Sequence, residues 1–231
     1  MTKLWTSDED LFGLIKQELF TAVVGDVMDK IGLTHQFLPP RIKPIHSDMV
    51  VICRAMPVLE MDVFSEVVKN SANDLMSKPF GLMFQALDDL KPNEVYICTG
   101  ASPRYALRGE MMSTRAIKLG AVGAVVDGYM RDTRAVLALN YPTFAYGSYA
   151  QDQGVRGKVV DFRIPIEMDS VLVRPGDVVF GDIDGVCIIP KEAEEEVFTA
   201  ALEKARGEKL VKAAIVSGMS AVDAYAKYGI M

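Results

Sequence analysis

Apolar residues near the N-terminus recur at the spacing of helices that bury one face. Two such faces are visible, formed by Leu11, Leu14, Ile15 and Leu19, and then by Val24, Val27, Met28 and Ile31. Thr21 is placed to cap the second helix, and Gly32 is placed to end it. The pattern predicts two helices over about residues 8–32.

The middle of the chain alternates between β-rich runs and helical spacing. After a proline-rich passage at residues 38–44, we expect a strand at 49–53, a helix at 80–90, a strand at 94–98, a helix after Gly109 and a strand at 124–127. This mixed order predicts a layered α/β fold in which helices cover a sheet.

Beyond Pro142 the pattern changes to short strands. We expect them at residues 143–146, 158–164, 171–173, 177–180 and 185–189, followed by two helices over about 191–229. Ser220 stands three residues before Asp223, which is typical of a capped helix start. The chain contains no internal repeat and no evident linker. We therefore expect one domain over residues 1–231, with the N-terminal and C-terminal helices packed on it.

Composition narrows the classes of function. Half of the residues are apolar and 24% are charged, as in ordinary globular proteins. The net charge is −6, and no segment clusters Lys and Arg among aromatics, so we expect no nucleic-acid partner. No apolar run has the length of a membrane span, and the N-terminus turns acidic where a signal peptide would become apolar. We expect a cytoplasmic protein whose three separated cysteines are buried thiols.

One dipeptide combines two kinds of chemistry. Arg131 and Asp132 follow a glycine-punctuated strand, and α/β folds bind ligands at loops that follow strands. Arg offers a rigid bidentate donor for a carboxylate or an enolate, while Asp offers a hard oxygen ligand for Mg²⁺ or Mn²⁺. Taken alone, such a pair is more often part of a solvated turn, so the surrounding sequence has to show whether it belongs to a site.

A second loop, at residues 100–110, supplies that context. It follows the strand at 94–98 and enters a helix, whose backbone donors would face a bound anion. Twenty residues separate Glu110 from Arg131. An acidic residue followed, after twenty residues, by Arg-Asp is a pattern in which this chain resembles the RraA-like family. That family includes class II 4-hydroxy-4-methyl-2-oxoglutarate/4-carboxy-4-hydroxy-2-oxoadipate (HMG/CHA) aldolases. Residues 21–29, 175–177 and 182–186 extend the resemblance over nearly the whole chain.

The resemblance implies a fold and a division of labour. The fold would be the family's swivelling β/β/α domain with N-terminal and C-terminal helices. Asp132 would bind the metal, Mg²⁺ or Mn²⁺, and Arg131 would contact the substrate carboxylate and the enolate oxygen. Glu110 would hold a metal-bound water, and the backbone amides of Met111 and Met112 would complete the carboxylate site.

The same resemblance implies an activity. It is that of a metal-dependent lyase that cleaves 4-hydroxy-2-oxo acids to pyruvate, decarboxylates oxaloacetate, or does both through a pyruvate enolate. A homotrimer or hexamer with sites between subunits is expected, and Glu208 is the positional candidate for an acidic residue from the neighbouring subunit. The alternative is a non-catalytic regulator that binds a ribonuclease or another protein. In that regulator the metal-binding Asp is replaced, whereas Asp132 is present here.

Other kinds of site have less support. The glycines form no dinucleotide fingerprint and no phosphate loop, so we expect no nucleotide or organic cofactor. His35 and His46 lack partners at zinc-ligand spacing. The run from Asp182 to Gly185 is typical of a hairpin turn rather than a calcium loop. Residues 146–157 depart from the family pattern, so the resemblance does not identify the substrate.

Overall fold

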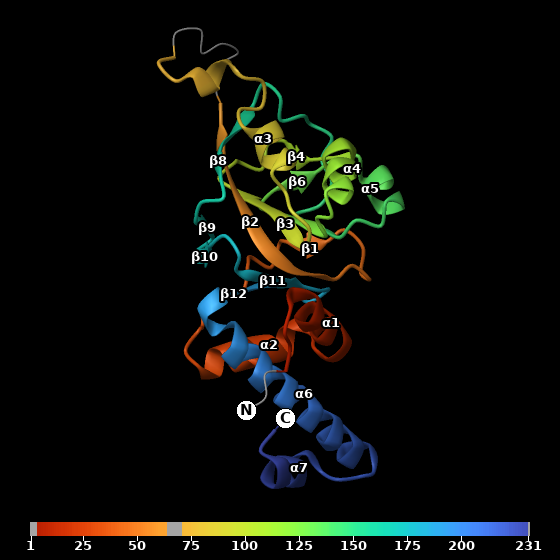
Figure 1. Ribbon diagram of the computed structural model, residues 1–231. Helices are drawn as coiled ribbons and strands as arrows, with labels where there is room; N and C mark the ends of the chain where they lie inside the picture. The colour runs from red at the N-terminus through yellow and green to blue at the C-terminus, as the bar shows by residue number, and fades with distance from the viewer. Residues whose placement is uncertain (1–3, 64–70, 231) are drawn as a thin grey trace. The chain divides into compact units, whose positions relative to one another are not determined.

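The computed structural model describes residues 4–63 and 71–230 (Figure 1). The chain divides into two compact units. One consists of His35–Lys191, and the other combines Met1–Thr34 with Glu192–Met231. Whether the two units form a single domain, as expected above, stays a prediction.

An eight-stranded sheet forms the centre of the unit His35–Lys191 (Figure 1). Its order is β1 (Lys43–Pro44), β7 (Thr143–Ala145), β5 (Gly123–Val126), β3 (Glu94–Thr99), β2 (Val51–Asp62), β11 (Val178–Gly181) and β12 (Val186–Ile189), and β8 (Gly157–Phe162) also pairs with β2. Strands β7, β5, β3 and β2 are mutually parallel, whereas β11 and β8 run antiparallel to β2. The long strand β2 therefore pairs with β11 along its first half and with β8 along its second.

Alternate residues of the sheet contribute to two separate cores, as the two-residue period of a strand requires. Tyr96 and Cys98 pack in one core with the helices α3 (Met83–Asp88), α4 (Glu110–Lys118) and α5 (Thr133–Ala138). Val95 and Ile97 pack in the other, with the hairpin of β9 (Ile166–Met168) and β10 (Val171–Val173). The layers are thus β/β/α, which confirms the predicted fold class. All three cysteines are buried free thiols, as predicted.

Short elements account for most differences from the predicted pattern. The loop expected at residues 100–110 contains β4 (Ala106–Arg108), and the turn expected after residue 127 contains β6 (Tyr129–Met130), which pairs with β4 in parallel. Helix α5, the hairpin strand β9 and the 3₁₀ turn η1 (Asp74–Ser77) were not predicted either. Elements this short contain too few residues to show a period. The predicted hairpin turn between β11 and β12 is confirmed.

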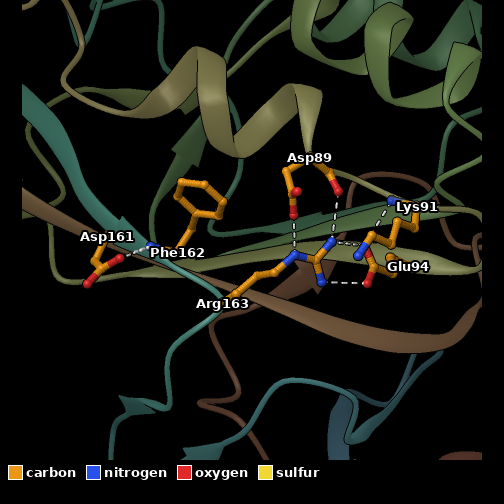
Figure 2. A network of polar contacts seen from close by, with 6 residues as sticks. All are labelled: Asp89, Lys91, Glu94, Asp161, Phe162 and Arg163. Atoms are coloured by element: carbon orange, nitrogen blue, oxygen red, sulfur yellow. Dashed lines mark hydrogen bonds and ion pairs between the residues drawn. The ribbon is translucent and has the colours of Figure 1, made fainter.

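A polar network ties the start of β3 to the end of α3 (Figure 2). Arg163, which follows β8, donates from Nη1 to Glu94 Oε1 at 2.7 Å and from Nη2 to Glu94 Oε2 at 2.8 Å. The same guanidinium donates to the carboxylate of Asp89 and, at 2.7 Å, to the Asp89 carbonyl oxygen. Bidentate pairing of this kind fixes orientation as well as charge.

The other unit is helical. It contains α1 (Asp8–Glu18), α2 (Thr21–Lys30), α6 (Glu194–Val216) and α7 (Ala221–Tyr228). The 3₁₀ turn η2 (Lys191–Ala193) spans the boundary between the two units in the sequence, just before α6. Helices α1, α2 and α7 all contact α6, and the faces predicted from Leu11 to Ile31 are largely buried. Ser220 Oγ accepts from the Asp223 backbone N at 3.1 Å, so the predicted cap is confirmed. In the described residues no helix is long and apolar enough to cross a membrane.

Candidate functional site

The pairing of β4 with β6 brings together the two loops that the sequence singled out. The backbone N of Arg131 donates to the carbonyl oxygen of Arg108 at 2.8 Å. One residue further along each chain segment, Gly109 and Asp132 are neighbours, and each precedes a helix. The predicted residues Glu110, Arg131 and Asp132 therefore lie at one place, held by backbone hydrogen bonds.

Asp132 has a backbone conformation that aims its carboxylate at the start of α4. Its φ of 58° lies in the left-handed region, which Asp tolerates better than most residues. Its Oδ2 accepts from the backbone N of Glu110 at 3.1 Å. A Cβ on Gly109 would lie 2.4 Å from that oxygen, so this close approach requires glycine. The carboxylate remains 42% exposed, which leaves it accessible to a ligand from solution.

Arg131 lies between two carboxylates. Its Nε is 3.8 Å from Asp132 Oδ2, and its Nη1 is 2.8 Å from Asp152 Oδ1. Asp152 belongs to the segment 146–157, and its other oxygen accepts from the backbone N of Gly154 at 2.9 Å. The sequence marked this segment as unusual but gave no reason to place Asp152 beside Arg131, which lies 21 positions earlier in the chain.

The first turn of α4 faces the same region. The N-cap residue Gly109 has no side chain, and the first backbone N–H groups of any helix lack acceptors within it. These include the amides of Met111 and Met112, where the helix dipole also favours negative charge. The Glu110 side chain is exposed, whereas Met112 is buried. Anion binding by the two amides stays a prediction that this geometry permits.

A cavity of about 370 Å³ adjoins these residues. Arg131, Asp132 and Asp152 are among its polar lining residues, and Phe80 and Met83 are among the apolar ones. The volume lies at the lower end of the range for small-molecule sites.

Two buried polar residues, Gln153 and Arg108, also line the cavity. Gln153 donates from Nε2 to Glu60 Oε2 in the interior. Burial raises the pKa of Glu60 to about 8, so that carboxyl is mostly protonated at neutral pH. Arg108 is 2% exposed and lies against the faces of Tyr96 and Tyr141, at 5.1 Å and 5.4 Å from the ring centroids.

The donor set suits a hard divalent ion. Asp132 provides an exposed carboxylate, and no group of three or more His, Cys, Asp or Glu side chains able to hold a metal occurs among the described residues. Zinc sites normally have three or four protein ligands. Mg²⁺ instead keeps several waters and needs one or two carboxylates, so Asp132 fits the predicted Mg²⁺ or Mn²⁺.

Glu208 lies in the helical unit, on α6. There it forms an ion pair with Lys204, which also contacts Asp26 at 2.8 Å. This arrangement gives Glu208 a partner within its own chain. Its predicted role in a neighbouring subunit's site stays a prediction.

Comparison with known proteins shows the family to which the chain belongs. A protein of Halalkalibacterium halodurans named "Putative 4-hydroxy-4-methyl-2-oxoglutarate aldolase" is 31% identical over 207 residues, which cover 89% of each chain. A solved structure described as a novel cellulase from microbes associated with the gut ecosystem is 28% identical, covers 90% of each chain and gives a TM-score of 0.79. Streptomyces coelicolor RraAS2, described as an unusual member of the RNase ES inhibitor RraA family, shares the fold, with 20% identity, a TM-score of 0.75, and coverage of 90% of this chain and 98% of its own. Residues 21–188 match the RraA-like family model described as Aldolase/RraA, and the chain belongs to that family.

Proposed function

We propose that this protein is a divalent-metal-dependent lyase that cleaves 4-hydroxy-2-oxo acids to pyruvate and decarboxylates oxaloacetate. The observation that carries the proposal is the convergence of the Asp132 carboxylate, the Arg131 guanidinium and the start of α4 beside one cavity. The name of the Halalkalibacterium relative supports the aldolase part of it.

Both reactions place negative charge at the same oxygen. When the C3–C4 bond breaks, its electron pair forms the C2–C3 double bond of an enolate, and the C2 oxygen gains the charge. The Arg131 side chain is 40% exposed, so its guanidinium donors can stabilise that oxygen and the adjacent C1 carboxylate. The amides of Met111 and Met112 would bind the carboxylate at the start of α4. Bound to Asp132, Mg²⁺ or Mn²⁺ would supply further positive charge beside the C2 oxygen.

Retro-aldol cleavage also needs a proton to leave the C4 hydroxyl, and both reactions need a proton at C3 of the enolate. Glu110 is the candidate for this transfer, since it begins α4, its backbone N donates to Asp132, and its side chain is exposed to solvent. A carboxylate in contact with solvent can exchange protons with water between turnovers.

The test compares turnover with and without metal. Purified protein is assayed with oxaloacetate and with a panel of 4-hydroxy-2-oxo acids, in Mg²⁺, in Mn²⁺ and in EDTA. We expect activity that EDTA abolishes, and a loss of at least about 100-fold in kcat/KM for Asp132→Ala with unchanged circular dichroism. Asp48→Ala, which removes another exposed carboxylate, serves as the matched control.

Two results would contradict the proposal. One is activity that survives EDTA or the Asp132→Ala substitution. The other is a covalent adduct trapped by borohydride in the presence of pyruvate, because it would indicate a lysine Schiff base in place of a metal.

A further inference from the structure

One charged residue of the cavity lining has no part in the proposed reaction. Asp152 lines the cavity together with Arg131, and its Oδ1 lies 2.8 Å from Arg131 Nη1. The other carboxylate beside that guanidinium belongs to Asp132, whose Oδ2 lies 3.8 Å from Arg131 Nε. Because Asp132 is the proposed metal ligand, Asp152 is the carboxylate that remains as the ion-pair partner of Arg131.

The backbone around Asp152 is attached to both strands that carry the site. Residues 147–149 form two backbone hydrogen bonds with β6, of 3.0 Å and 2.9 Å. Further along, the backbone N of Ala106, on β4, donates to the Gln151 carbonyl oxygen at 2.8 Å, and Asp152 lies opposite Ala106 in a parallel bridge. Since Arg131 directly follows β6, the same small sheet sets the backbone positions of both members of the ion pair.

Asp152 is also held by contacts of its own and of the next residue. Its Oδ2 accepts from the Gly154 backbone N at 2.9 Å, and its carbonyl oxygen accepts from Arg156 Nη1 at 3.0 Å. Gln153 is 3% exposed and donates to the carboxyl of the buried Glu60, on β2. The Asp152 carboxylate is therefore a fixed point beside the long side chain of Arg131.

A fixed partner matters for an arginine that has to bind an anion. A free arginine side chain loses conformational freedom when it binds, whereas one already held in a single orientation loses less. Carboxylates beside two different nitrogens, Nε and Nη1, also define how the planar guanidinium is turned. Building on the proposed function, we infer that Asp152 is a positioning residue that holds the Arg131 guanidinium in the orientation that binds the carboxylate and enolate oxygens.

The test uses a ligand that binds without being cleaved. Oxalate is planar and carries oxygens where a pyruvate enolate carries its carboxylate and enolate oxygens, so its affinity reports how well Arg131 is placed. Oxalate is titrated by calorimetry into the full-length protein in the presence of Mg²⁺, and Mg²⁺ alone is titrated separately. The kcat and KM for oxaloacetate are measured on the same preparations.

Two substitutions of Asp152 separate its charge from its shape. Asp152→Asn keeps the shape of the side chain and removes its charge, and Asp152→Ala removes the whole group. Each should weaken oxalate binding and lower kcat/KM about tenfold, with most of the loss in kcat, because the guanidinium is less well placed for the charge that develops. The affinity for Mg²⁺ alone should stay within about twofold, since Asp132 keeps its hydrogen bond from Glu110. Asp161→Ala, at an exposed aspartate of β8, should change none of these values.

A double-mutant cycle separates positioning from a general structural effect. In an Arg131→Met background, measured at raised oxalate concentrations, Asp152→Asn should change the oxalate affinity by less than about twofold, because no guanidinium is left to hold. The full loss in that background would overturn the inference, as would unchanged or tighter oxalate binding by both Asp152 variants. An unmodified protein that neither binds oxalate with Mg²⁺ nor turns over oxaloacetate would instead refute the proposed function, on which the inference rests.

Discussion

Replacing Glu60 by glutamine should remove a strong dependence of stability on pH. Glu60 lies on β2, is 2% exposed, and has the neutral amide of Gln153 as a hydrogen-bond partner. Burial raises its pKa from an ordinary 4.5 to about 8, and the hydrogen bond from Gln153 offsets only part of that shift. Glutamine has nearly the same shape and does not titrate in this range.

The sign and size of the effect follow from the two pKa values. Because the folded-state pKa is raised, the stabilising contribution of Glu60 is fully present below pH 4.5 and is lost as pH rises to about 8. At about 1.4 kcal/mol for each pH unit, this interval corresponds to about 5 kcal/mol. That figure is an upper bound, because the protein around a buried carboxylate relaxes and water enters when the group ionises.

The assay is urea denaturation of the unmodified protein and Glu60→Gln at pH 5, 6, 7 and 8, followed by circular dichroism. The free energy of unfolding of the unmodified protein should fall relative to that of the variant by several kcal/mol over this range. Glu167→Gln, at an exposed glutamate of β9, should leave the pH dependence unchanged. A difference between the unmodified protein and Glu60→Gln that stays constant from pH 5 to pH 8 would refute the reasoning.

Two further substitutions test the site and the sheet. Gly109→Ala should weaken Mg²⁺ binding about tenfold, measured by calorimetry, because the new Cβ would displace the Asp132 carboxylate. The unfolding free energy of this variant should stay within about 1 kcal/mol of that of the unmodified protein. An unchanged affinity for Mg²⁺ would contradict this account. Arg163→Met should lower the unfolding free energy by about 2–3 kcal/mol in urea titrations, because Glu94 loses its bidentate partner and Asp89 loses two hydrogen bonds in a partly buried region. A loss below about 0.5 kcal/mol would show that the network contributes little.

Much of the fold could be predicted because its signals are local. The central strands are runs of buried Val and Ile, and the terminal helices repeat apolar residues every three or four positions. The proximity of Glu110 to Arg131 and Asp132 could be predicted because these residues stand at the ends of loops that lead from parallel strands to helices. Such loops meet at one edge of a parallel sheet. Neither inference needed a contact between distant side chains.

The features that escaped prediction depend on tertiary contacts. Charged residues are normally assigned to the surface, yet Arg108 and Glu60 are buried, Arg108 against Tyr96 and Glu60 beside Gln153. Asp152 reaches Arg131 from a segment with no periodic pattern. Strands β4 and β6 have three and two residues, too few for alternation to appear.

The pairing of β4 with β6 separates the part of the site that substitutions can alter from the part that they leave in place. A backbone hydrogen bond between the two strands holds Arg131 beside Arg108, while many apolar residues of the cavity lining lie in or next to α3, which belongs to neither strand. Substitutions in α3 can therefore reshape the cavity while the backbone that carries Arg131 and Asp132 keeps its pairing. A laboratory library confined to residues 80–87 would explore new substrates at small risk to the chemistry.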